Sequence, residues 1–282
     1  MRALADTGAL GLLDQIADKL GVKISFKTNM LDVAQNIAVV IIAVACSLFF
    51  MAAMNYYWPA EKRRVHNDLI GWQLSILGTT YAVILGFMLY TVWIDFGSAE
   101  LNAEAEANSL DNLYRLSDAL PPAQGNALKT LTRAYGDAVV DHEWPEMAAN
   151  GIPAETRIIA RQMWATLTSA QGGSPAQVTA LDHAFSELGA LAGYRRIRMV
   201  ESAARIPSVL WFVLLIGAAV TIASTCLFGA SNGALHVVQV IAFSLLISLG
   251  LVAIADINRP YQGSVHITDY AFRRAQVDMK EQ

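Results

Sequence analysis

The segment Ile206–Ala255, IPSVLWFVLLIGAAVTIASTCLFGASNGALHVVQVIAFSLLISLGLVAIA, decides the fold, because its 50 residues include no Asp, Glu, Lys or Arg. A helix needs roughly 20 apolar residues to cross the hydrocarbon core of a bilayer, so the segment is long enough for two crossings. Its middle, residues 229–233 (GASNG), consists of small and turn-forming residues, and a helical hairpin would reverse its direction there. The segment therefore predicts two transmembrane helices, over residues 206–227 and 235–257.

Two further windows without a charged residue precede this hairpin, residues 33–60 and 69–94, and each is long enough for one crossing. Of the whole chain, 55% is hydrophobic and only 16% is charged, whereas soluble domains usually have about a quarter of their residues charged. Core helices of soluble proteins rarely extend so far without a charge. The four spans predict an all-α integral membrane protein with four transmembrane helices embedded in the lipid bilayer.

The predicted spans divide the chain into five parts. These are an amphipathic N-terminal arm (1–30), transmembrane helices 1 and 2 (31–95), a helical domain inserted between helices 2 and 3 (96–204), transmembrane helices 3 and 4 (205–258) and a C-terminal tail (259–282). The apolar side of the arm would lie on the membrane surface or cap the inserted domain.

The Lys and Arg residues predict on which side of the membrane each part lies. Of the 20, only Lys62, Arg63 and Arg64 lie in the loop between spans 1 and 2, and the turn at 229–234 has none. All the others belong to the arm, the inserted domain and the tail, which four crossings place on one side. Because cytoplasmic segments carry an excess of Lys and Arg, both termini and the inserted domain are predicted to be cytoplasmic. The cluster at 62–64 counts against this orientation.

The inserted domain is predicted to be a helical bundle, since its apolar residues recur with a helical period and show no strand alternation. Helix breaks are expected at Pro121-Pro122, at Pro145 and at the stretches 151–153 and 172–175, which contain Gly and Pro.

Two transmembrane helices are expected to continue into this bundle. No Pro separates Phe96 from Leu116, and residues 99–108 are rich in Ala and Glu, so the second span is predicted to extend into the first helix of the domain. The last helix of the domain is likewise predicted to lead through Arg195–Arg205 into the third span. Such continuous helices indicate one mechanical unit and not a tethered domain.

The sequence contains no recognisable catalytic or metal-binding pattern. Its five histidines are scattered without metal-binding spacing, and Cys46 and Cys226 both fall inside predicted spans, where we interpret them as packing residues. No P-loop, G-x-G-x-x-G or G-x-S-x-G motif is present. We therefore predict no enzyme activity, no cofactor and no metal site. The net charge of −4 argues against a general nucleic-acid binder.

The densest polar cluster of the inserted domain is DHEWP at residues 141–145. His142 lies between two carboxylates and would suit a pH sensor, because histidine is the side chain that titrates near neutral pH. The same cluster would also end a helix before Pro145, with Trp144 packed into the bundle. We favour this structural interpretation, since a proline is an ordinary helix stop.

One stripe of the second span, at i, i+4, i+8 and i+11, consists of Thr79, Val83, Phe87 and Tyr90. The small residues Gly78, Ala82 and Gly86 flank it, and small residues let helices approach closely in lipid. Repeated around an axis, such a stripe would form a narrow constriction that excludes water. A lipid-facing or packing stripe has the same spacing, so both interpretations stay open.

Charged residues near the predicted membrane borders also have two interpretations. Glu100, Glu104 and Asp111 share one helical face, which would form a ring of negative charge in an oligomer or else face bulk water. Asp256 and Arg259 are three residues apart at the end of the fourth span and are expected to form an ion pair there.

Residues 81–93, YAVILGFMLYTVW, resemble the second transmembrane helix of bestrophins around the Leu85-Gly86-Phe87 core. A longer set of motifs is similar to the bacterial bestrophin-like membrane proteins: EAEA at 104–107, LYR at 113–115, EWPEM at 143–147, RRIR at 195–198, IPSVLW at 206–211 and NRPYQG at 258–263. The similarity covers most of residues 67–270, and as a set these motifs are fairly specific.

This resemblance implies a homo-oligomeric ion channel, pentameric in bestrophins, with four transmembrane helices per subunit and cytoplasmic helices around a central pore. It implies a bacterial inner-membrane location and small anions such as chloride as the permeant ions. Bestrophins form their neck from three apolar residues, and the match at 85–87 carries these over to Thr79, Val83 and Phe87. Bestrophins usually have bulkier residues at the first two of these positions.

We expect Tyr90 to extend this neck, and a charged vestibule to be supplied by Glu100, Glu104, Arg195 and Arg198. Calcium gating is not expected, because residues 264–269, which follow this motif, include a single carboxylate and a hard cation needs six or more oxygen ligands. The alternative function is a non-conducting membrane adaptor or sensor whose cytoplasmic helical domain binds a partner.

Overall fold

The computed structural model describes residues 30–149, 151, 154–171 and 173–281. These residues form two compact units. The first, called the span unit here, consists of residues 30–95 and 205–258. The second, called the polar unit, consists of the described residues of 96–204 together with 259–281. The expected N-terminal arm lies outside the described residues except for residue 30.

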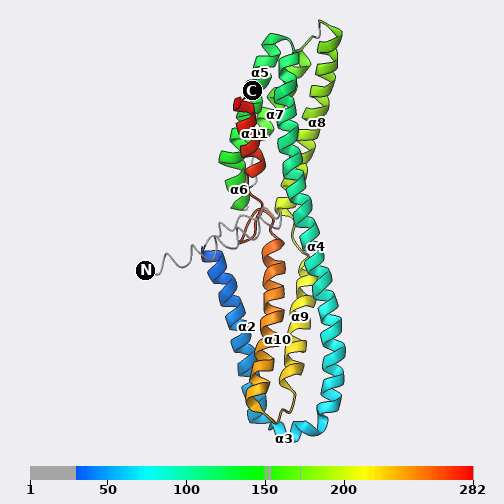
Figure 1. Ribbon diagram of the computed structural model, residues 1–282, viewed down its shortest axis with the longest axis vertical. Helices are drawn as coiled ribbons and strands as arrows, with labels where there is room; N and C mark the ends of the chain where they lie inside the picture. The colour runs from blue at the N-terminus through cyan, green and yellow to red at the C-terminus, as the bar shows by residue number, and fades with distance from the viewer. Residues whose placement is uncertain (1–29, 150, 152–153, 172, 282) are drawn as a thin grey trace, which may run out of the picture. The chain divides into compact units, whose positions relative to one another are not determined.

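The span unit is built from four helices that lie side by side (Figure 1). They are α2 (Met30–Tyr57), the first part of α4 (Asn67–Leu116), α9 (Ser208–Cys226) and α10 (Gly233–Ile257). Two short elements, α3 (Ala60–Arg63) and η1 (Arg64–His66), connect α2 to α4. All four are long and apolar enough to cross a membrane, and the described residues include no strand. The predictions of an all-helical chain and of four apolar spans are confirmed.

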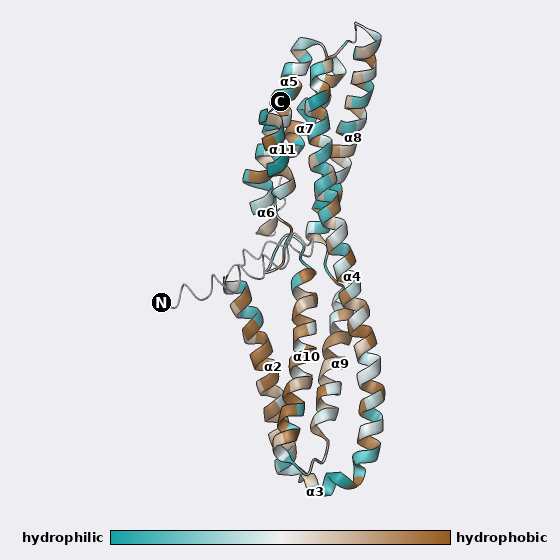
Figure 2. Cartoon of the chain, viewed as in Figure 1, coloured by the Kyte–Doolittle hydropathy of each residue, from teal (hydrophilic) through white to brown (hydrophobic). Residues whose placement is uncertain are grey.

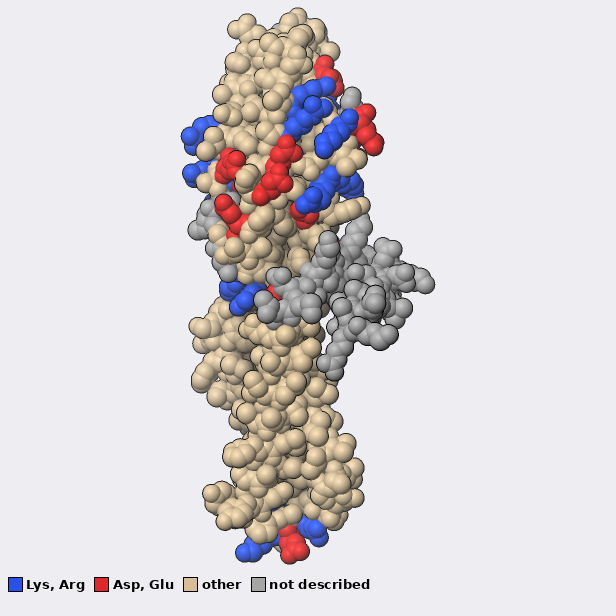
Figure 3. Space-filling model, turned by 90° about the vertical axis from the view of Figure 1, so that its left-hand side faces the viewer, with Lys and Arg blue, Asp and Glu red and all other residues tan. Residues whose placement is uncertain are grey.

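The polar unit contains the remaining helices of the described chain. They are η2 (Ser117–Ala119), α5 (Pro122–Ala138), η3 (Val139–Glu143), α6 (Trp144–Ala148), α7 (Glu155–Ser169), α8 (Pro175–Ala203) and α11 (Tyr270–Glu281), together with the second part of α4. On the face seen in Figure 3, charged side chains of both signs are scattered over this unit, whereas most of the visible surface of the span unit carries none.

Helix α4 is one continuous helix of 50 residues, as expected from the absence of proline between Phe96 and Leu116. The corresponding prediction for the other end of the bundle is wrong. Helix α8 ends at Ala203, residues 204–207 are not helical, and α9 begins at Ser208. The cause is Pro207, because a proline disfavours helical geometry in the residue before it and offers no N–H to the preceding turn.

The helix that was expected to stop before Pro145 passes through it. After α5 the chain forms the π-helical turn η3, and Pro145 then lies in the first turn of α6, a position that tolerates a residue without an N–H. The helical path ends only at Ala148. The predicted burial of Trp144 is confirmed: its Nε1–H donates to the carbonyl of Ile267 at 3.2 Å, and its ring packs edge-on against Tyr261.

In the span unit, α4 packs against α9 and α10 through glycines on those two helices. A Cβ on Gly217 would lie 2.5 Å from the Tyr81 ring, and one on Gly250 would lie 2.9 Å from Leu85. A Cβ on Gly78 or on Gly86, by contrast, would meet no other helix within 4 Å among the described residues. The close approach of α4 therefore uses glycines of α9 and α10, and the small residues flanking the predicted stripe lie on a different face.

Candidate functional site

Helix α4 has two distinct faces within the span unit. One face packs on α9 and α10 through Tyr81, Leu85 and Val92, and the Tyr81 hydroxyl donates to the carbonyl of Leu214 at 3.1 Å. The predicted stripe occupies the opposite face. Its residues are exposed, by 52% at Val83, 68% at Phe87 and 62% at Tyr90, and Thr79 is exposed with them. The stripe is therefore free to meet lipid, a second subunit or water.

The exposed surface of α4 is more polar than that of the other spans. Its exposed aliphatic hydroxyl and amide side chains within the span unit are Gln73, Ser75, Thr79, Thr80 and Thr91. The span that contains α4 also has the lowest mean hydropathy of the four, and the pale colour of its lower half contrasts with α2 and α10 (Figure 2). Thr79 and Thr91 donate to carbonyls one turn earlier, at 2.8 and 2.9 Å, so both acceptor lone pairs of each hydroxyl remain available to water.

A buried arginine fastens the loop end of the span unit, which we define as residues 58–66 and 227–232. Arg63 is fully buried; its Nη1 donates to the carbonyl of Cys226 at 2.7 Å and its Nη2 donates to Asn55 Oδ1. Cys226 is the last residue of α9, so the guanidinium satisfies an unpaired terminal carbonyl and lies at the negative end of the helix dipole.

The same loops are joined a second time through Asn67. Its Nδ2 donates to the carbonyl of Gly229 at 3.1 Å, and the Gly229 N–H donates back to its Oδ1 at 2.9 Å. A Cβ on Gly229 would lie 2.6 Å from both the Ala60 carbonyl oxygen and the Arg64 amide nitrogen, so only glycine fits there. Two members of the basic cluster thus differ in role: Arg63 is structural, while Arg64 remains on the surface.

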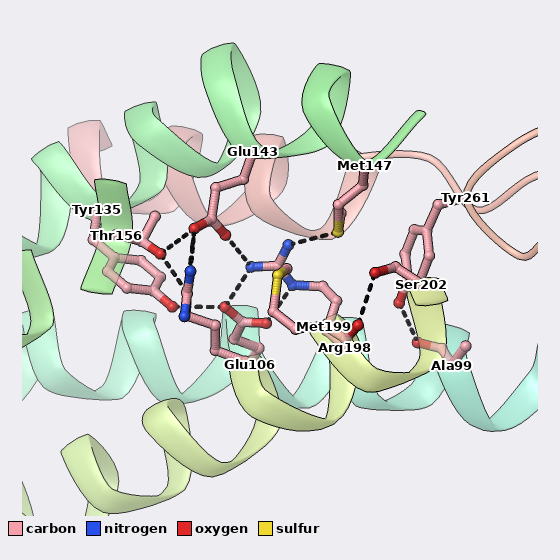
Figure 4. Close-up of polar contacts among 11 residues, drawn as sticks. Ala99, Glu106, Tyr135, Glu143, Met147, Thr156, Arg198, Met199, Ser202 and Tyr261 are labelled. Carbon is pink, nitrogen blue, oxygen red and sulfur yellow. Dashed lines mark hydrogen bonds and ion pairs between the residues drawn. The ribbon is translucent and has the colours of Figure 1, made fainter. Parts of the chain in front are cut away.

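The polar unit contains a buried ion network centred on Arg198. Its Nε and Nη2 donate to the two carboxylate oxygens of Glu106, at 2.6 and 2.9 Å, and Nη2 also donates to Glu143 at 2.8 Å. All three side chains are 0% exposed. Figure 4 shows the guanidinium lying between the two carboxylates. One guanidinium balances the charge of only one of these two buried carboxylates. The cluster is neutral only if a second cation joins it.

Arg195 supplies that second cation. Its Nη2 donates to Glu143 at 2.6 Å, and its side chain is only 13% exposed. The Tyr135 hydroxyl donates to Glu106 at 2.7 Å, and the Thr156 hydroxyl donates to Glu143 (Figure 4). Two cations thus balance two anions, held by side chains from α4, α5, η3, α7 and α8. The network is a neutral and fully hydrogen-bonded clamp, the arrangement in which buried charges are tolerated.

The surroundings of the network set the protonation of its members. Burial alone would raise the pKa of the Glu143 carboxyl, but the guanidinium of Arg198 and the hydrogen bonds from Arg195 and Thr156 outweigh burial and lower that pKa. Burial and the carboxylate that it contacts raise the pKa of Tyr135 well above its ordinary value. Near neutral pH Tyr135 therefore keeps its proton and donates a hydrogen bond to Glu106.

This linkage predicts acid sensitivity of the polar unit. A carboxyl whose pKa is lower in the folded state contributes stability above its unfolded pKa, about 4.3 for glutamate, and loses it as the pH falls through the folded value. We expect the unfolding temperature in detergent to fall as the pH is lowered below about 4.5. In Thr156→Val, which removes one of the bonds that lower the Glu143 pKa, the fall should be smaller and should be complete at a higher pH, because the folded pKa then lies closer to the unfolded one. An identical pH profile in the two proteins would contradict this assignment.

The four residues predicted to supply the charge of the vestibule differ in their exposure. Arg198 faces the interior of the bundle and presents no charge at the surface, which differs from the exposed role expected for it, and Arg195 is mostly enclosed as well. Glu100 and Glu104 are partly exposed on α4, so a vestibule role for these two stays a prediction.

Other predicted charges are placed as follows. Asp111 pairs with Arg115 at 2.7 Å, so its charge is locally compensated. Asp256 and Arg259 belong to different units, and their ion pair stays a prediction. His142 and Glu155 lie 3.9 Å apart with both side chains well exposed.

Sequence reasoning missed Glu106 and Glu143 as site residues. Both lie in motifs that carried the resemblance: Glu106 in 104–107, Glu143 in 143–147 and the two arginines in 195–198. The motif at 258–263 contacts the motif at 143–147, because Gln262 donates to the Met147 carbonyl at 2.8 Å and Tyr261 packs on Trp144. Motifs far apart in the chain thus meet in one cluster, and that convergence was the available signal.

Four apolar helices in one unit and a charged helical unit in the other define the chain as an integral membrane protein. A sequence profile described as Bestrophin-like domain matches residues 41–272, and the chain belongs to that family. The comparison with curated proteins gave no match.

Solved structures of low sequence identity share the fold. A bacterial bestrophin homolog from Klebsiella pneumoniae is 14% identical, with a TM-score of 0.63 over 87% of this chain and 98% of that one. A point mutant of a bacterial bestrophin homolog from the same organism is 13% identical, with a TM-score of 0.65 over 87% of this chain and 99% of that one. A structure described as a membrane protein is 14% identical, with a TM-score of 0.63 over 88% of this chain and 99% of that one.

Proposed function

We propose that this protein is an oligomeric ion channel whose pore is lined by α4. The observation that carries the proposal is the character of the outer face of α4, which is exposed in the subunit yet bears the hydroxyls of Thr79, Thr80 and Thr91. A face that meets only lipid would gain from being as apolar as those of α2 and α10. Membership of the Bestrophin-like family supports the same function.

In this proposal several copies of α4 gather around a common axis, so that Thr79, Val83, Phe87 and Tyr90 point into the lumen. The large rings of Phe87 and Tyr90 would form the narrowest and most easily dewetted part of the lumen. Thr79 and Val83 are smaller than the residues that bestrophins usually have there, so this section would be wider and wetter. Following the family resemblance, we propose a pentamer that conducts small anions such as chloride.

We further propose that the protein lies in the bacterial inner membrane with both termini in the cytoplasm. The exception to the charge distribution was the cluster Lys62–Arg64, and the burial of Arg63 accounts for part of it. The fold holds Arg63 at the end of α9, so its position is explained by packing. It should therefore not be counted when membrane orientation is inferred from surface charge. Two surface cations remain on that side, Lys62 and Arg64, which strengthens the positive-inside argument.

The test is ion flux through the full-length protein in liposomes. Phe87→Ala and Val83→Ala should each change the salt-gradient current, because both remove side chains from the proposed lumen. Phe49→Ala is the matched control, since Phe49 is similarly exposed (77%) but lies on α2. Current that is the same in all three variants and the parent protein would remove α4 from the pore. No flux at all, with soluble proteins that co-purify and are lost on deletion of 97–204, would favour the adaptor function.

The oligomeric state is a second, independent test. Native mass measurement in detergent should give a closed ring of subunits, five in the pentameric proposal. A monomer or a dimer would leave no common axis for α4 and would exclude a central pore.

A further inference from the structure

The exposed face of α4 begins well before Thr79. Trp72 lies seven residues earlier, and at 100° per residue its side chain leaves the helix within about 20° of the direction of Thr79 and about 10 Å nearer to the loop end. It is 67% exposed, almost the same as Phe87. On the opposite side Ile70 is buried and Gly71 faces Phe228, so the packed face of α4 at this level lies away from the indole.

Side-chain size varies along this face in a regular way. From the loop end inward, the residues on it are Trp72, Ile76, Thr79, Val83, Phe87 and Tyr90. Bulky aromatic rings therefore lie at both ends, and the two smallest side chains lie between them. If the face is repeated around an axis, the lumen has two narrow parts separated by a wider chamber lined by Thr79 and Val83.

We propose that Trp72 forms a second constriction, at the loop end of the pore, and that it limits the size of the ions that enter the chamber. This inference rests on the proposed channel function and adds a residue that sets specificity. A ring of indoles is rigid, because the side chain has only two rotatable bonds, and it narrows the entrance without adding charge. It therefore discriminates by size: small monovalent ions pass, and larger organic ions of the same charge are excluded.

The competing role for Trp72 is that of an interfacial anchor, because tryptophans also gather where a transmembrane helix leaves the bilayer. The two roles differ in what the side chain touches. An anchor touches lipid and can be replaced without changing conduction. A constriction touches water and ions, and its removal opens the entrance.

The experiment compares Trp72 with a residue at the same depth on another helix. Trp72 is the sixth residue of α4 and Val238 the sixth of α10; both helices start at the loop end, and Val238 is 61% exposed. Trp72→Ala should raise the flux of small ions about threefold, as expected when roughly one RT is removed from an entry barrier. It should also admit larger organic ions such as gluconate. Val238→Ala should change neither.

Thiol accessibility provides a measurement that does not depend on conduction. In a Cys46→Ser background, Trp72→Cys and Val238→Cys are treated with a membrane-impermeant methanethiosulfonate from the loop side. A cysteine in the aqueous entrance ionises and reacts, whereas one in lipid does not. We expect Trp72→Cys to react and flux to fall on reaction, with Val238→Cys unreactive.

The outcomes separate the two levels of the proposal. If Trp72→Ala conducts like the parent and Trp72→Cys is as unreactive as Val238→Cys, while Phe87→Ala alters flux, the outer constriction is wrong and the channel stands. If Phe87→Ala also leaves flux unchanged, the channel proposal itself fails. Trp72→Phe keeps a bulky ring and should retain the exclusion of gluconate; loss of exclusion in that variant would contradict a size filter.

Discussion

Arg198→Met is expected to destabilise the polar unit by about 3–5 kcal/mol, the usual cost of removing one partner from a buried ion pair. The change leaves Glu106 and Glu143 facing each other in the bundle interior with Arg195 as the one remaining cation. Two carboxylates without adequate compensation must then be protonated, or the bundle must open to admit water. The unfolding temperature in detergent, followed by circular dichroism, measures the effect.

The neighbouring Arg196 offers a matched control, because it is exposed on the same helix and Arg196→Met should change stability by less than about 0.5 kcal/mol. The charge argument is checked further by adding Glu106→Gln and Glu143→Gln to Arg198→Met, which removes the unpaired charges and should recover part of the loss. Equal stability of Arg198→Met and Arg196→Met would show that the network does not hold the unit together.

Arg63→Leu is expected to have a comparable effect on the span unit. The substitution leaves the buried terminal carbonyl of Cys226 without its donor, at about 1–3 kcal/mol, and removes the hydrogen bond to the exposed Asn55 side chain. It also removes a cation from the negative end of α9, which is worth up to about 1 kcal/mol more. We expect a lower unfolding temperature and poor recovery of folded protein from membranes.

Arg64→Leu is the control for this prediction. Arg64 follows Arg63 directly in the chain, but its side chain is exposed and makes a single 3.3 Å hydrogen bond to the Ala230 carbonyl. Its loss should be nearly neutral, as is usual for exposed polar contacts. If both substitutions are equally mild, Arg63 does not fasten the loop end.

The four spans and the continuity of α4 could be predicted because they depend on local composition. Whether a window without charged residues is long enough to cross a bilayer can be counted directly from the sequence. A helix that contains no proline has no local reason to stop. The end of α8 was missed because the chain before Pro207 contains good helix formers, and the effect of the proline on the preceding residues decided the outcome.

The π-helical turn η3 bears on the second wrong prediction, that a helix would stop before Pro145. Periodicity arguments assume 3.6 residues per turn, but η3 inserts one extra residue into the ladder and shifts which side chains face inward. The sequence analysis considered His142 because histidine titrates near neutral pH; that residue is exposed, whereas Glu143 is fully buried against Arg198. No spacing rule on a regular helix would have selected it.

The ion network itself depends on pairings between distant parts of the chain, since Glu106 and Arg198 are 92 residues apart. Composition and periodicity do not encode such a contact. The resemblance motifs contained its members, but they did not show that four short motifs meet at one point.

Helix α4 is unbroken from Asn67 to Leu116, and every turn between Phe87 and Glu106 retains its regular backbone bonding. A helix without a break has no hinge at which a rotation about its own axis would be absorbed. In the proposed channel, such a rotation of α4 would exchange which side chains face the lumen, and it would do so without sliding or tilting the helix.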